Sequence, residues 1–173
     1  MEFYKRKGIA LKELDSLVFA LSNNEYSETK WKIPDHHVTT LFIGNNLDII
    51  KSKHFEEFKE NMIDIIVMEC LVIIPDGIVF CTCNPSIMIA NKIPHITILT
   101  CKLKPFMSNE IGEKLFLGIP ELKDLYNSKR FKDRSFEYCN EFVIEIKGAK
   151  VKAYVINFNK EIKLHGVTKK IYN

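Results

Sequence analysis

Two runs of β-branched and apolar residues, 62–74 and 78–83, are joined by the triplet Pro75-Asp76-Gly77. Proline, aspartate and glycine are typical of tight turns, whereas β-branched side chains favour strands. The two runs are therefore predicted to pair as an antiparallel hairpin. The C-terminal part repeats the pattern, with strand-like segments at 142–146, 152–158 and 162–167 and a Lys147-Gly148 turn after the first of them.

Two segments between these strands carry helical signals. Residues 47–59 place apolar side chains near helical spacing, and residues 108–117 begin with Ser108, a residue type that often caps helix N-termini. A chain of 173 residues is long enough for one domain with a sizeable core. We therefore predict a single α+β domain, residues 1–173, in which strands dominate.

A His-apolar-Thr triplet occurs twice, as His37-Val38-Thr39 and as His95-Ile96-Thr97. Each triplet comes after a proline-containing turn and enters an apolar run. Because side chains alternate between the two faces of a strand, each histidine should share a face with the threonine two residues later. One such triplet usually marks an ordinary polar strand face. Two triplets in one small domain predict a site that combines all four polar side chains.

Two imidazoles and two hydroxyls suit acid–base chemistry on a phosphodiester. A reference pKa of about 6.5 allows one histidine to be neutral and another charged near neutral pH. His37 and His95 can therefore supply a general base and a general acid, and their individual roles stay open. Thr39 and Thr97 can donate hydrogen bonds to the non-bridging phosphate oxygens. The expected reaction needs no metal ion and no other cofactor.

Charge and composition limit the partners. The net charge of +3 is too small for general coating of nucleic acids, and no apolar run reaches the length of a membrane span. The N-terminal segment lacks the apolar core of a signal peptide. The five cysteines form no disulfide framework, which favours a reducing compartment. We expect a monomer in the cytoplasm, with the nucleus as an alternative, and no membrane partner.

Two further clusters are candidate binding sites. Cys81-Thr82-Cys83 lacks a second cysteine or histidine pair at a spacing usual for zinc, so packing is the favoured interpretation. Basic runs are mostly solvated faces. Lys102 and Lys104 are the exception, because they follow the second triplet closely enough to contact an RNA backbone.

The paired triplets resemble those of the 2H phosphoesterase superfamily, which is defined by two His-x-Thr/Ser motifs. The likeness is greatest to the catalytic domain of 2′,3′-cyclic nucleotide 3′-phosphodiesterases and to the cyclic-phosphodiesterase domain of fungal-type tRNA ligases. It rests on the segments 37–42 and 94–98, with Cys101 soon after, and continues weakly through 159–163 and Gly166. It spans most of the chain, but only the two motifs are specific.

The resemblance implies a bilobal α+β fold, in which two mainly antiparallel sheets form a central cleft and helices lie outside. It also implies hydrolysis of 2′,3′-cyclic phosphates to 2′-phosphates at RNA ends or on nucleotides, as in RNA processing and repair. Phe42 matches an aromatic position that stacks on the base in that family, although plain core packing is an equal alternative. Pro105 is expected near a second base contact.

Two alternatives to this activity remain. A phosphodiesterase of the same superfamily acting on 2′,5′-oligoadenylates or cyclic oligonucleotides would use the same four side chains. A non-catalytic module that binds RNA ends would keep the fold, but binding alone does not require a pair of proton-transfer groups.

Overall fold

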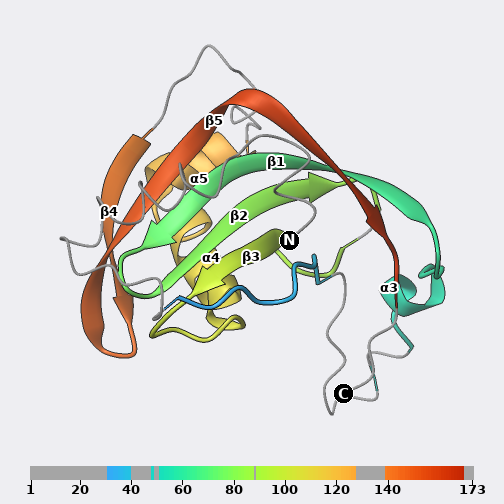
Figure 1. Cartoon of the computed structure of the whole chain (residues 1–173), viewed down its shortest axis with the longest axis horizontal. Coiled ribbons are helices and arrows are strands. Elements are labelled where there is room, and N and C mark those ends of the chain that lie inside the picture. The colour runs from blue at the N-terminus through green and yellow to red at the C-terminus, as the bar shows by residue number, and fades with distance from the viewer. Residues whose placement is uncertain (1–30, 40–47, 49–50, 88, 128–138, 170–173) are drawn as a thin grey trace.

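The computed structural model describes residues 31–39, 48, 51–87, 89–127 and 139–169. Its described elements follow the order α3 (Lys53–Glu56), β1 (Ile63–Ile74), β2 (Ile78–Pro85), β3 (His95–Thr100), α4 (Met107–Phe116), α5 (Pro120–Asn127), β4 (Cys139–Ile146) and β5 (Ala149–Val167). The strands form one antiparallel sheet in the order β3-β2-β1-β5-β4 (Figure 1).

Both predicted hairpins are confirmed. In the turn between β1 and β2, Asp76 takes a φ of 54° and the Gly77 amide donates to the Ile74 carbonyl at 3.0 Å. Lys147 and Gly148 join β4 to β5 with φ values of 52° and 80°. Two successive left-handed residues match the twist of a tight hairpin, which explains the glycine in second place.

The C-terminal strand differs from the prediction. The two segments 152–158 and 162–167 are parts of one strand, β5, that runs without a break from Ala149 to Val167. Its register against β1 jumps from Asn157 to Ile162, so residues 158–161 stand opposite the single residue Glu69. Such a bulge bends a strand without ending it, and β5 arches over the sheet in Figure 1. From sequence periodicity alone, the irregular stretch before residue 162 is predicted to be a break between two strands.

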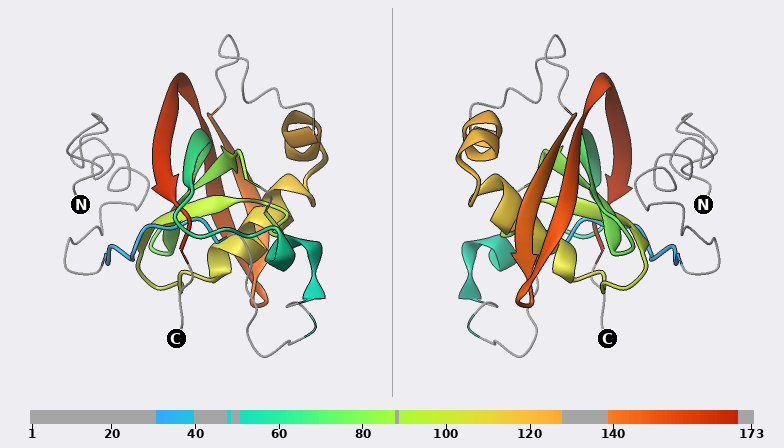
Figure 2. Two further views of the ribbon diagram at one scale, coloured as in Figure 1. Left: turned by 90° about the vertical axis from the view of Figure 1, so that its right-hand side faces the viewer. Right: turned by 90° about the vertical axis from the view of Figure 1, so that its left-hand side faces the viewer.

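The sheet separates two apolar clusters. Helices α4 and α5 cover one face (Figure 2), where Ile111, Leu115 and Leu122 pack with Val72 and Phe80. The other face carries a second cluster that contains Trp31, Leu71, Val79, Cys81, Cys83, Ile96 and Leu164. Cys81 and Cys83 are thus buried packing residues, and burial raises the pKa of both thiols. This agrees with the packing interpretation of that pair.

The two predicted helical segments both contain a helix, with bounds that differ from the predicted ones. Of the segment 47–59, the structure describes residues 48 and 51–59. There the α-helix is α3, which starts at Lys53 because Ser52 takes extended backbone angles and its hydroxyl accepts from the Phe55 amide at 3.4 Å. The helix expected from Ser108 begins one residue earlier, with Phe106 at the cap position. Ser108 therefore lies inside the first turn of α4, where its side chain has other partners.

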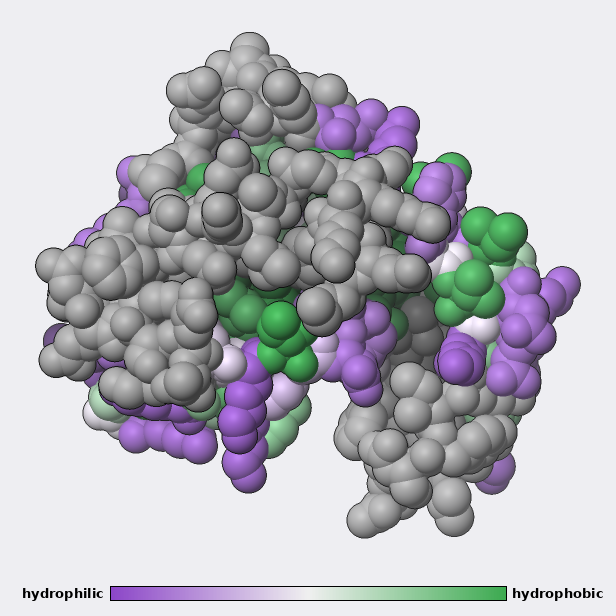
Figure 3. Space-filling model, viewed as in Figure 1, coloured by the Kyte–Doolittle hydropathy of each residue, from purple (hydrophilic) through white to green (hydrophobic). Residues whose placement is uncertain are grey.

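The α+β class is confirmed, and the described strands all belong to one sheet. A second sheet and a two-lobed arrangement stay predictions. Where β1 begins and β5 ends, apolar side chains reach the surface, among them Ile63 and Val167; this is the green area at the right of Figure 3. Within the described residues, no helix has the length and apolar character that crossing a membrane requires.

Candidate active site

The two His-x-Thr triplets lie next to each other at the edge of the sheet. Residues 31–39 run beside β3, joined to it by antiparallel bridges between Lys32 and Thr100 and between Val38 and Ile96. Continued by one residue on either side, the antiparallel register of the second bridge sets His37 opposite Thr97 and Thr39 opposite His95. Directly opposed residues share a face of the sheet. The register therefore gathers four polar side chains that are far apart in the sequence.

The apolar members of the triplets identify this face. Val38 and Ile96 belong to the cluster on the side of the sheet away from α4. His95 instead contacts the ring of Phe80, and Thr97 contacts Ser108 of α4. His95 and Thr97 therefore lie on the helix side of the sheet.

Both histidines are held by the same local hydrogen bond. His37 Nδ1 lies 2.9 Å from the carbonyl oxygen of Asp35, and His95 Nδ1 lies 2.8 Å from that of Ile93. A carbonyl can only accept, so Nδ1 carries the proton in each ring. In a neutral ring the lone pair is then on Nε2. The two motifs thus present equivalent tautomers, each ready to accept a proton at Nε2.

The surroundings of His95 favour its neutral form. Its ring lies edge to face against Phe80, with 5.5 Å between the ring centroids. Desolvation by burial is the main cause that lowers the pKa of His95 below its usual value, and the charge of His37 lowers it further. The hydrogen bond to Ile93 opposes this shift. His95 is therefore suited to accept a proton near neutral pH.

The first motif is more open to solvent. His37 is exposed, and Thr39 is half-buried. The Asn91 side-chain amide donates to the Thr39 carbonyl at 3.1 Å, so the loop before β3 fixes the backbone of the first motif. His36 points elsewhere, since its Nε2 donates to the Ile98 carbonyl at 3.2 Å.

Thr97 is connected to the first turn of α4. Its hydroxyl oxygen lies 2.7 Å from that of Ser108, and the Ser108 hydroxyl donates to the Pro105 carbonyl. Ser108 is fully buried. The sequence singled out Ser108 as a helix cap, and its contact with Thr97 depends on a packing of α4 against β3 that no local pattern reveals. The contacts of Asn91 with Thr39 and of Phe80 with His95 are likewise not predicted from the sequence, because they also join separate segments of the chain.

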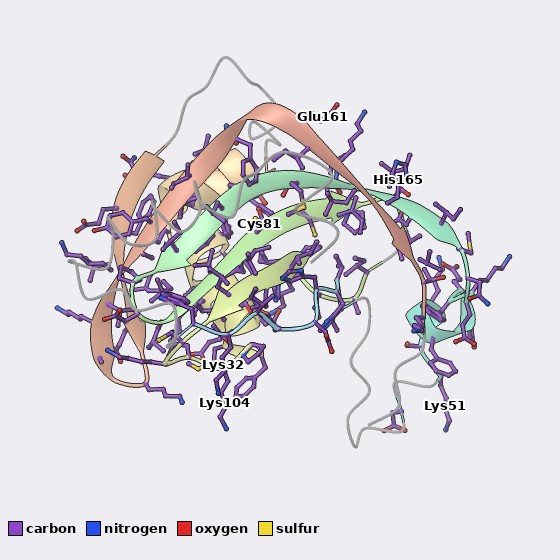
Figure 4. The ribbon with its side chains drawn as sticks, in the orientation of Figure 1. Lys32, Lys51, Cys81, Lys104, Glu161 and His165 are labelled. Carbon is purple, nitrogen blue, oxygen red and sulfur yellow. The ribbon has the colours of Figure 1, made fainter. Side chains whose placement is uncertain are left out.

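The remaining predicted contacts are placed as follows. Phe42 lies outside the described residues. Pro105 is exposed, directly before the turn that carries Ser108. Lys102 is exposed and pairs with Asp76 at 3.3 Å, whereas exposed Lys104 points to the lower edge of Figure 4, as does Lys32. The two motif segments thus lie side by side, and the lysines lie at the end of β3 away from His95.

Comparison with known proteins supports the fold. No family model matches the chain, and no curated protein matches its sequence. A fungal RNA kinase of known crystal structure has a similar fold, with a TM-score of 0.53 and 17% sequence identity. The match covers 92% of this chain but 42% of that chain, so this chain spans less than half of its length.

Proposed function

We propose that residues 1–173 form one 2H-phosphoesterase-like domain, bilobal in arrangement, that hydrolyses 2′,3′-cyclic phosphates of RNA ends or nucleotides to 2′-phosphates. The observation that carries this proposal is the matched pair of motifs on adjacent antiparallel segments, each with its histidine Nδ1 bonded to a carbonyl two residues earlier. A pair of equivalent proton-transfer groups facing one site is what cleavage of a cyclic phosphodiester requires.

In this reaction, His95 is the general base. Its lowered pKa and bound Nδ1–H leave a neutral ring whose Nε2 can take a proton from the attacking water. The water oxygen bonds to phosphorus as the bond to the ribose 3′ oxygen breaks. His37, protonated at Nε2, gives its proton to that leaving oxygen. The hydroxyls of Thr39 and Thr97 hold the non-bridging oxygens, where negative charge grows.

The test is turnover in the presence of EDTA, with 2′,3′-cyclic AMP and 2′,5′-linked triadenylate as separate substrates. We expect 2′-AMP from the first substrate. Turnover of the triadenylate alone would favour the oligoadenylate activity, and turnover of neither would favour the non-catalytic binding module. Loss of activity with the chelator would refute the metal-free scheme.

Single variants test the two histidines. His37→Ala and His95→Ala should each lower kcat by about 10²–10⁴-fold, the usual contribution of a general acid or base. The matched control is His165→Ala, because His165 is exposed on β5 (Figure 4) and outside the motifs. A fully active variant at either motif histidine would contradict the pairing.

A further inference from the structure

A chain of two hydroxyls links the second motif to α4. Thr97 Oγ1 lies 2.7 Å from Ser108 Oγ, and Ser108 Oγ in turn contacts the Pro105 carbonyl oxygen. Thr97 is half-buried on β3, while Ser108 is fully buried in the first turn of α4. The proposed function uses Thr97 but gives no role to Ser108.

Each hydroxyl has a single proton, and this fixes which group donates in each of the two contacts. The Pro105 carbonyl can only accept, so the Ser108 hydroxyl must donate its single proton to that contact. The contact between the two hydroxyls then needs the proton of Thr97. In this structure, Thr97 therefore directs its hydroxyl proton at Ser108 and presents only lone pairs to other groups. An anionic phosphate oxygen needs a donor, so this arrangement must change when substrate binds.

We propose that Ser108 is a positioning residue that switches Thr97 from acceptor to donor when a phosphate binds, an inference that rests on the proposed function. The Ser108 proton turns from the Pro105 carbonyl to Thr97 Oγ1, and the Thr97 proton turns to a phosphate oxygen. Each hydroxyl keeps its proton and rotates about its own C–O bond, so no covalent bond changes.

The energetics allow this exchange. Two hydrogen bonds exist before and after it, and the new one ends on a charged oxygen, which makes it stronger than a bond between neutral groups. The Pro105 carbonyl loses one donor but keeps the Ser108 backbone amide, which donates to it at 3.2 Å, and Pro105 is an exposed residue that water can reach. Ser108, buried and fixed by the helix, holds the Thr97 oxygen in place throughout, and its donated bond polarises the Thr97 hydroxyl.

A double-mutant cycle tests the switch, with kcat and KM for 2′,3′-cyclic AMP and the melting temperature as readouts. Thr97→Val should lower kcat by about 10²-fold, as loss of one oxyanion donor does. Ser108→Ala should lower kcat about tenfold, the loss expected of a hydrogen bond near the upper end of the net range. In the Thr97→Val background, Ser108→Ala should cost no further activity, because Ser108 acts only through Thr97.

Controls separate the switch from a general effect on folding. Ser52→Ala removes a hydroxyl from the cap of α3, outside both motifs, and should leave kcat unchanged. If Ser108→Ala does not fold, Ser108→Cys serves in both backgrounds, because a thiol is a weak donor of similar size. Equal losses from the Ser108 variant in both backgrounds, or full activity of that variant, would overturn the switch while the proposed function stands. A wild-type protein without turnover would overturn both.

Discussion

The two His-x-Thr motifs share a sequence pattern and a histidine tautomer but differ in their surroundings. His95 belongs to a strand of the sheet and lies against Phe80, with its pKa lowered by burial. His37 is exposed on a segment that runs along the edge of that strand. Desolvation lowers the pKa of His95 in this way, and under the proposed function this is the reason for assigning His95 as the base.

The largest expected effect comes from removing the apolar support of the second motif. Phe80 is fully buried between the sheet and α4, so Phe80→Ala should lower the free energy of unfolding by about 3–5 kcal/mol. Denaturant titration measures this loss. The matched control is Phe106→Ala, because Phe106 is 70% exposed and should change stability by less than about 0.5 kcal/mol. A loss below 1 kcal/mol at Phe80 would contradict the tight packing behind His95.

The next prediction concerns the pH dependence of kcat/KM. The acidic limb of this profile reports the pKa of the base in the free enzyme. Because burial lowers the pKa of His95, the limb should fall with a midpoint below the usual value of about 6.5. A midpoint above that value would contradict the assignment of His95 as the base.

Folding stability should also depend on the protonation of His95, and the lowered pKa of His95 sets the direction of the change with pH. The pKa of His95 is lower in the folded protein than in the unfolded chain, as is that of His36, where burial is again the main cause. Protonation therefore favours the unfolded chain, and stability should decrease as the pH falls below about 6.5. Melting temperatures between pH 8 and pH 5 measure it, and an increase toward acid would contradict the burial of both rings.

Features of the two motifs that arise from local interactions can be predicted from the sequence, whereas those that arise from contacts between distant segments cannot. Strand alternation is local, so it correctly places His95 and Thr97 on one face and predicts both hairpins. The register between residues 31–39 and β3 is not local, since its bridges join positions about sixty residues apart, such as Val38 and Ile96. Neither the residue pattern nor the family resemblance predicts this pairing; the repeated triplet predicts only that the four polar side chains belong to one site.

The difference in burial between His95 and His37 also could not be predicted from local sequence patterns. It arises from Phe80 on β2, which contacts His95 only because β2 pairs with β3. Ser108 shows the limit of local rules most clearly. A serine near a helix start favours capping, yet this hydroxyl contacts the Pro105 carbonyl three residues earlier and, because α4 packs on β3, the Thr97 hydroxyl. Tertiary contacts therefore decide what a locally ambiguous side chain does.

A smaller effect is expected from the support of the first motif. Asn91→Ala removes the donor to the Thr39 carbonyl, so kcat/KM should fall by about twofold to tenfold, the value of one net hydrogen bond. The change should be smaller than the loss at Thr97. Asn127→Ala, at the exposed end of α5, is the matched control and should leave kcat/KM unchanged. Full activity of Asn91→Ala would mean that the first motif needs no such anchor.

The smallest predicted effect separates two neighbouring lysines beyond the second motif. Lys102 already pairs with Asp76, an exposed ion pair that contributes little to stability, whereas exposed Lys104 lies next to Pro105 and points to the surface. If RNA follows this edge toward Thr97, Lys104→Ala should weaken binding of a short RNA with a 2′,3′-cyclic phosphate by about two- to fivefold, with a weaker salt dependence. Lys102→Ala should have less effect, because an RNA phosphate must first compete with Asp76. Fluorescence anisotropy at two salt concentrations measures both, and an equal loss from the two variants would show that the edge attracts RNA through its overall charge rather than through Lys104.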